Sequence, residues 1–333
     1  MSLFTPRRLW VAAALAGLLT LPVWLGHHPY YVNISGQILL WAVAALALNV
    51  LVGYAGLVSL GHAGLLAMTG YTVGLLLHAG YGHLAAGLGA IAVTLAASAV
   101  FAVLALRSTG IGFLMITLAL GQIVWGVAYR WASLTNGDNG VSVASRPAPF
   151  GIDLAGAEAF YYATLLLFLL AVVSMRVFVR SPLGASVRGT RDQARRMTAL
   201  GYNVWLVRFL AFLLSGFWSA VAGLLYVYYH QFIAPPVASL QGSAEILLMV
   251  ISGGSATLLG PIAGAAIVVI MKNVVSAYIE RWNLVLGLIF ILIISFMPEG
   301  LVPGSARLWR AGRQWLGART NGWAARLAGE RRP

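Results

Sequence analysis

The feature that most constrains this 333-residue chain is a series of apolar runs with the length of membrane-crossing helices. A helix that crosses the hydrocarbon layer needs about 20 predominantly apolar residues. Ten runs are predicted, at residues 9–25, 34–52, 61–79, 84–106, 110–129, 159–179, 207–229, 243–252, 260–278 and 284–298. The run at 243–252 is short and ends in glycines, so we expect a broken or re-entrant helix there. The sequence therefore predicts an all-α, polytopic membrane protein with about 8–10 spans.

Composition excludes the main soluble classes. Hydrophobic residues make up 60% of the chain and charged residues only 9%, whereas soluble domains carry about 25% charged residues. A soluble enzyme or a nucleic-acid-binding domain is excluded, despite the net charge of +13. The chain has no GxxxxGK[ST] phosphate loop and no long soluble segment. We therefore expect a non-catalytic chain that binds no cofactor, with any ATP hydrolysis on a partner polypeptide.

The arginines predict the orientation. With ten crossings, 17 of the 20 arginines fall on the same side as both termini. By the positive-inside rule, the N- and C-termini are expected to be cytoplasmic. The chain then divides into a membrane domain, 1–301, and a basic cytoplasmic tail, 302–333. The first run is expected to be a retained helix, because no small-x-small cleavage site follows Pro22.

Two glycine-rich segments depart from ordinary lipid-facing helices. Residues 53–64 read GYAGLVSLGHAG, and residues 252–264 read SGGSATLLGPIAG. Such glycines either interrupt a helix at membrane depth or let helices pack closely, as a GxxxG pair at Gly70 and Gly74 would. In the second segment, Pro261 predicts a new helix beginning near Gly260. One interrupted segment in each half suggests an internal pseudo-repeat around a central pathway.

Titratable groups within the predicted spans are few. His62 is a functional candidate, although the residues favour the structural interpretation, a histidine bonded to a neighbouring carbonyl. Glu245 and Glu280 lie at span edges, so a proton relay is disfavoured. A sodium-coupled carrier that uses backbone carbonyls stays open.

A basic segment lies between two predicted spans, at residues 181–202. Arg188, Arg191 and Arg195 recur there at helical spacing. A short basic amphipathic helix can bind a partner protein or lie on anionic lipid, and the spacing does not choose between them.

Several motifs together resemble one family, the permeases of branched-chain amino-acid ABC importers, and the LivM type more than the LivH type. The resemblance covers roughly residues 35–301, in family order. It is carried by GYAGLVSLGHAG at 53–64, RSTGIGFLMITLALGQ at 107–122, TNGDNG at 135–140, SPLGASVR at 181–188, and the glycines and proline of 253–264.

The resemblance implies the transmembrane subunit of a binding-protein-dependent importer in a bacterial plasma (inner) membrane. Its partners would be a second permease of the LivH type, two cytoplasmic ATPase subunits that bind ATP and Mg²⁺, and a periplasmic or extracellular solute-binding protein. Segment 181–202 would then be the coupling loop on the ATPase. The implied coupling residues are Arg188, Arg191, Asp192, Arg195 and Gly201. Residues implied in the translocation path or helix breaks are Ser59, Gly61, His62, Gly64, Thr117, Gln122, Ser215, Gly253, Gly254, Gly260 and Pro261. Thr135, Asp138 and Gly140 are implied in binding-protein docking.

This chain departs from the family pattern in its coupling loop. Coupling loops of the family commonly carry a glutamate where this chain has Ala194, which predicts a divergent ATPase partner. Branched-chain or similar small amino acids are the expected solutes. Urea, short amides and small organic acids are the alternatives that related systems carry.

Overall fold

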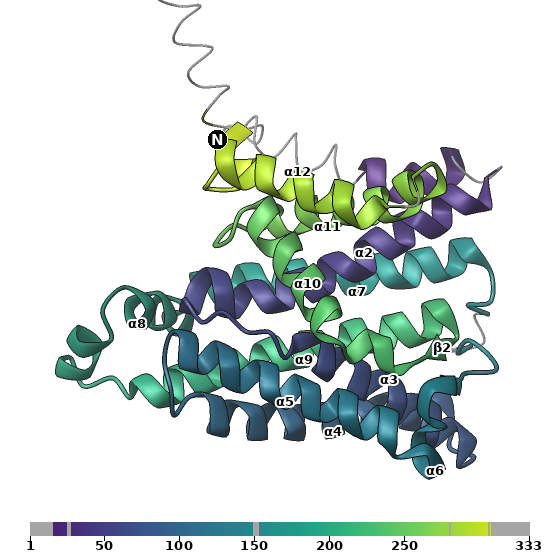
Figure 1. Cartoon of the computed structure of the whole chain (residues 1–333), viewed down its shortest axis with the longest axis horizontal. Coiled ribbons are helices and arrows are strands. Elements are labelled where there is room, and N and C mark those ends of the chain that lie inside the picture. The colour runs from purple at the N-terminus through teal and green to yellow at the C-terminus, as the bar shows by residue number, and fades with distance from the viewer. Residues whose placement is uncertain (1–15, 25–27, 149–152, 280, 306, 308–333) are drawn as a thin grey trace, which may run out of the picture.

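The structure is a computed structural model that describes residues 16–24, 28–148, 153–279, 281–305 and 307. Long helices lie side by side and run between two ends of the molecule (Figure 1). One end carries α8, Pro182–Ala199, and the other carries α6, Ala132–Thr135, with β2, Phe232–Ile233.

The ten predicted runs correspond to ten helical segments. Nine are α2 Pro29–Asn49, α3 His62–His78, α4 His83–Ala105, α5 Ile111–Arg130, α7 Ala157–Arg180, α9 Val204–His230, α10 Leu240–Gly253, α11 Leu259–Val274 and α12 Trp282–Phe296. The remaining one is seen as a helix at 16–24, and the rest of run 9–25 lies outside the described residues. Most of the tail at 302–333 also lies outside them.

Within the described residues, six helices are long and apolar enough to cross a membrane, which confirms a polytopic helical protein. They are Pro29–Ala55, His83–Ala105, Ile111–Arg130, Ala157–Arg180, Val204–His230 and Leu259–Ala277. Helix α10 has 14 residues and is therefore about 21 Å long at 1.5 Å per residue. Since the hydrocarbon core is about 30 Å thick, α10 is too short to cross it, as expected from the short eighth run.

The centre of the bundle is formed by α2 and α9. In the most apolar window of each helix, 89% of α2 and 67% of α9 is buried, against 22% of α5. Helix α2 packs against α11, α7 and α9, while α3 packs against α9 and α4. The exposed faces of α4, α5 and α7 carry large apolar side chains such as Leu88, Ile123 and Leu170, which suits a surface facing lipid or another membrane subunit.

The small elements cap the end opposite α8. Between α5 and α7 come α6, the 3-10 turn η2, Gly137–Asn139, and β1, Val141–Ser142. Strand β1 pairs antiparallel with β2, with Val141 opposite Ile233. The 3-10 turn η4, Pro235–Ala238, lies between β2 and α10 in the chain and packs against α3 and α5, and the 3-10 turn η5, Val275–Ala277, follows α11.

This hairpin explains the glycines of α3. A Cβ at Gly70 would contact the Ile233 side chain, and a Cβ at Gly74 would lie 2.6 Å from Cγ1 of Val141. The expectation that this pair packs helix against helix is wrong. The glycines make room for the two β-bridge residues instead, because the hairpin lies across α3 at that height.

Candidate functional site

The first glycine-rich segment is a break between α2 and α3. Helix α2 loosens into a π-helical turn, η1, Val50–Ala55, and Gly56 then adopts a left-handed φ of 68°. Residues 57–61 run without helical structure before α3 begins at His62. A π-helical turn inside a helix often marks a functional position, and backbone of this kind is tolerated at membrane depth only against protein or a cavity.

A chain of hydrogen bonds through His62 holds this break. Ser215 Oγ of α9 donates to the Ala47 carbonyl at 2.6 Å and lies 2.7 Å from Nε2 of His62. Because the hydroxyl has one proton, Nε2 must be the donor to Ser215. In the neutral ring, Nδ1 accepts from Ser59 Oγ, 2.9 Å away. In this assigned tautomer, His62 is connected to the Ala47 carbonyl through the Ser215 hydroxyl.

Close packing accompanies the break. A Cβ at Gly61 would lie 2.6 Å from the Thr117 carbonyl oxygen, and one at Gly64 would lie 3.1 Å from Cα of Gly121 on α5. Thr117 Oγ1 accepts from the Leu60 amide at 3.2 Å. The sequence left a break and close packing as alternatives, and both are present. Gln122, the neighbour of Gly121 on α5, is half-buried.

The second glycine-rich segment is a tight turn between α10 and α11. Gly254 has φ 117° and ends α10, and α11 begins at Leu259, with Gly260 and Pro261 in its first turn as predicted. A Cβ at Gly253 would overlap the carbonyl oxygen of Gly260. The backbones of α10 and α11 therefore touch at this level, so no larger residue fits without separating the two helices.

The two breaks contact each other through Asn49, a residue that the sequence reasoning did not select. Asn49 is the last residue of α2 and is 1% exposed. Its Nδ2 donates to the Thr257 carbonyl at 2.8 Å, and its Oδ1 accepts from the Ala256 amide at 3.1 Å. An asparagine inside an apolar run was the available indication, since buried amides need hydrogen-bond partners.

The basic segment forms the predicted helix, α8. Ser181 Oγ accepts from the Gly184 amide at 3.1 Å, and Pro182 occupies the first helical position, so the helix has a favourable start. Gln193 has φ −151° and ψ 90°, which kinks α8 beyond its midpoint. The residues of α8 before Gln193 and those after it therefore do not share one helix axis.

The predicted coupling residues divide into two groups. Arg188 Nη1 donates to the Val179 carbonyl of α7 at 2.8 Å, and Arg191 Nη1 donates to the Gly53 carbonyl of the first break. Asp192 and Arg195 are exposed on α8, and within the described part of the chain neither forms an ion pair. Gly201, at φ 86°, ends the helix in a conformation that favours glycine.

The predicted docking residues also divide. Thr135 is buried and donates to the Ala128 carbonyl at 2.7 Å. Gly140 has φ 66°, and its backbone lies against that of Ile233 and Ala234. Of the three residues, only Asp138 is exposed. Thr135 and Gly140 therefore shape the loop that presents Asp138.

Comparison with known proteins identifies the family. Residues 30–294 match the family described as branched-chain amino acid transport system / permease component. The chain belongs to this family. It is 28% identical over 300 residues to the high-affinity branched-chain amino acid transport system permease protein LivM of Salmonella typhimurium, and over 302 residues to LivM of Escherichia coli. Each alignment covers 82% of this chain and 70% of the relative. No solved structure matches.

The match extends over both breaks and α8 of the permease. It begins one residue after the start of α2 and ends within α12. The segments on which the sequence resemblance rested are thus inside the family region. Three of these segments contact one another in the fold, because Asn49 connects the two breaks and Arg191 connects α8 to the first break.

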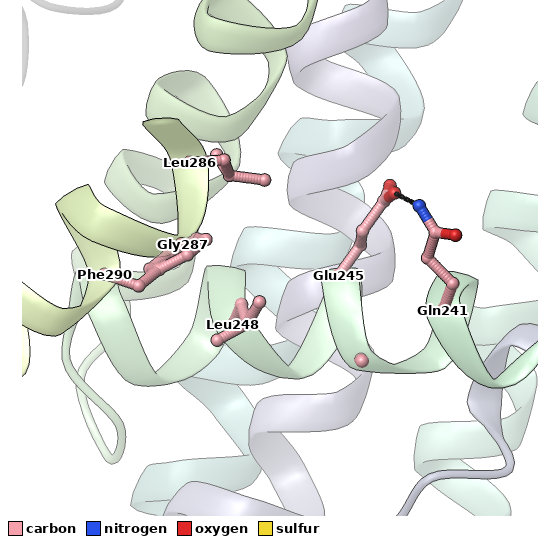
Figure 2. A pocket seen from close by; sticks show the side chains of 7 residues that line it. Gln241, Glu245, Leu248, Leu286, Gly287 and Phe290 are labelled. Atoms are coloured by element: carbon pink, nitrogen blue, oxygen red, sulfur yellow. Dashed lines mark hydrogen bonds between the residues drawn. The ribbon is translucent and has the colours of Figure 1, made fainter. Parts of the chain in front are cut away.

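A cavity of about 340 Å³ lies between α10 and α12 of the permease, away from both breaks. Figure 2 shows Leu286 and Phe290 of α12 facing Leu248 of α10, with Gln241 bonded to Glu245. Glu245 pairs with Lys272 at 3.2 Å, so its charge is compensated where it is largely buried. None of the path residues predicted from sequence lines this cavity.

At the end of the permease opposite α8, Arg146 connects α9 to the segment before α7. The sequence analysis did not select this residue. Its guanidinium donates to the carbonyls of Tyr228, Tyr229 and Ala155 at 3.0 to 3.3 Å and covers the Phe160 ring. Burial lowers the pKa of Arg146. Among the described residues, no group of three or more His, Asp or Glu side chains could hold a metal ion.

Proposed function

We propose that this permease is the transmembrane subunit of a binding-protein-dependent ABC importer, driven by ATP hydrolysis on partner subunits. The observation that carries the proposal is the family match over residues 30–294, nearly the whole membrane domain. The proposed cargo is branched-chain or similar small amino acids, because both LivM relatives are named as permeases of branched-chain amino acid transport systems. The partners are a second permease of the LivH type, two cytoplasmic ATPases that bind ATP and Mg²⁺, and an extracytoplasmic solute-binding protein.

Helix α8 is the proposed contact with the ATPase. It lies at one end of the bundle, joined to α7 by Ser181, and its exposed face carries Asp192 and Arg195. Arg188 and Arg191 instead bond to carbonyls of the membrane domain. We assign Asp192 and Arg195 to partner contact. Arg188 and Arg191 transmit the motion of α8 to the helices, and Gly201 ends α8.

The proposed orientation of the permease in the membrane follows from the assignment of α8 to the ATPase contact. If α8 faces the ATPases, its end of the bundle is cytoplasmic, in agreement with the arginine distribution. Both termini are then cytoplasmic and the membrane is the bacterial inner membrane. The opposite end, where α6 and the hairpin lie, faces the binding protein, and Asp138 is its exposed candidate for a charged docking contact.

The translocation path is proposed to follow the two breaks. Hydrogen bonds and close contacts around the first break come from Ser59, Gly61, His62, Thr117 and Ser215. Gly253, Gly254, Gly260 and Pro261 form the second, while Gly64 and Gln122 lie at or beside the α3–α5 contact. With His62 in its neutral form, this set carries no charge, which suits a neutral or zwitterionic solute.

Purification of the tagged chain in mild detergent tests the assembly. We expect a second permease and ATPase subunits to co-purify, and uptake of leucine into proteoliposomes to require ATP and the binding protein. In the Asp192→Arg/Arg195→Glu double variant, the ATPase should dissociate, since the charge pattern of the exposed face of α8 is reversed. Thr198→Val, a substitution on the same helix, is the matched control and should retain the ATPase.

A stable chain that purifies alone would contradict the importer assignment. If that chain takes up solute in a sodium gradient without partners, it is a self-sufficient ion-coupled carrier. If the complex assembles but carries urea, short amides or organic acids instead of leucine, the importer assignment stands and the cargo assignment is wrong.

A further inference from the structure

The side chain of Asn49 occupies an unusual position for an amide in an apolar helix. It is buried at the end of α2, and both ends of its carboxamide bond to the α10–α11 turn, about 200 residues later in the chain. The carboxamide has the same donor and acceptor groups as a peptide bond. Asn49 therefore binds the turn as a neighbouring strand would, by exchanging one donor and one acceptor.

The turn has few other means to satisfy these groups. Ala256 has φ 61°, a left-handed conformation that is rare for a residue other than glycine, and its amide points to Asn49. Thr257 Oγ1 closes the turn by donating to the Gly254 carbonyl and accepting from the Gly260 amide. The Ala256 amide and the Thr257 carbonyl are the groups that Asn49 satisfies, so the shape of the turn depends on α2.

The same π-helical region contacts α8. Arg191 donates to the Gly53 carbonyl, and a Cβ at Gly56 would lie 2.8 Å from Cγ of Arg191. Gly53 also packs against Ala256, because a Cβ placed there would overlap the Ala256 amide nitrogen. Turn η1 thus lies between α8 and the α10–α11 turn, in contact with both.

We propose that Asn49 is a positioning residue that makes the α10–α11 turn move with the first break when α8 moves. This inference rests on the proposed function, since it needs α8 to be displaced by an ATPase. Arg191 connects α8 to η1, and Asn49 connects η1 to the second break. The two breaks then change conformation together, in response to one displacement.

The complete importer, with both permeases, the ATPases and the binding protein in proteoliposomes, provides the test. In Asn49→Leu, which keeps a similar volume but removes both hydrogen bonds, we expect leucine transported per ATP hydrolysed to fall at least tenfold. Arg191→Met should cause a similar fall. The double variant should be no worse than the more affected single variant, because both residues act in one connection. Additive losses, or normal coupling in Asn49→Leu, would overturn the proposal.

A thiol readout separates positioning from a purely structural role. The chain has no cysteine, and Ser255 in the turn is exposed, so Ser255→Cys places one thiol on this subunit. We expect its labelling rate by a maleimide to differ between the nucleotide-free and ATP-bound complexes. This difference should disappear in Asn49→Leu and in Arg191→Met. A rate that does not respond to nucleotide in the otherwise unchanged complex would also overturn the proposal.

Asn273→Leu is the matched control. Asn273 donates to the Gln37 side chain and to its own helix, away from both breaks. Its replacement should leave transport per ATP within twofold and retain the labelling response. If Asn49→Leu fails to assemble, Asn49→Asp and Arg191→Met decide: normal coupling in either one counts against the proposal. Failure of the unchanged chain to bind any ATPase would instead contradict the proposed function.

Discussion

The two helix breaks of the permease differ in how they satisfy their backbone. The first, between α2 and α3, is held by side chains of its own and of α9, through Ser59, His62 and Ser215. The second, between α10 and α11, is a five-residue turn, 254–258, that forms two hydrogen bonds with the Asn49 side chain, one donated and one accepted by its carboxamide. The first break is therefore supported by a polar network, whereas the second depends on close backbone contact and on the first break.

Substitution of the tightest glycine should have the largest effect. In Gly253→Ala, the new methyl group would overlap the Gly260 carbonyl, and a backbone atom cannot rotate away. We expect a loss of about 3 kcal/mol of stability, the upper end of the usual cost of overpacking, because the neighbour is a rigid backbone atom. The yield of monodisperse protein and its thermal unfolding in detergent measure the loss.

Two further alanine substitutions calibrate this result. Gly126→Ala on α5 has no atom within 4 Å of the new Cβ and should be neutral. Gly61→Ala in the first break should be intermediate, since its Cβ would lie 2.6 Å from the Thr117 carbonyl oxygen. Equal yields of Gly253→Ala and Gly126→Ala would mean that α10 and α11 separate easily, and the comparison between the breaks would fail.

Removing one hydroxyl from the hydrogen-bond network of the first break should lower stability moderately. Ser215→Ala removes the acceptor of the His62 Nε2 proton and the donor to the Ala47 carbonyl. Leaving one buried polar group unpaired costs about 1–3 kcal/mol, so thermal unfolding should shift accordingly. Ser219→Ala, a buried serine one turn further along α9, is the control. The same stability in both variants would show that the network contributes nothing to the first break.

Sequence reasoning predicted the helices and the positions of both breaks because these depend on local patterns. Apolar runs give the spans, and glycine with proline gives the interruptions at 53–64 and 252–264. The partners of individual residues depend on tertiary contacts, and these were missed. Gly70 and Gly74 face the β1–β2 hairpin, Thr135 and Gly140 are buried, and Arg188 bonds to α7.

Asn49 is the most instructive omission. The capacity to carry a charge marked His62 within the spans, and the family motifs marked Gln122, but Asn49 is neutral and lies just before the first motif. In an apolar environment an amide also needs partners, which makes each such residue a predictor of a long-range contact. The partner itself, 208 residues away, could not be read from the pattern.

Thr257→Val should have the smallest effect and sharpens the comparison most. The substitution removes the hydroxyl that bonds to the Gly254 carbonyl and the Gly260 amide. Losing a capping hydroxyl costs about 0.5–2 kcal/mol. The lower half of that range is expected, because the two Asn49 bonds and the glycine contacts persist. The exposed Thr198→Val is the control for thermal unfolding. If the second break depends on the first, Thr257→Val destabilises the protein less than Asn49→Leu. The reverse order would mean that the turn is held by its own threonine, and the two breaks would then be independent.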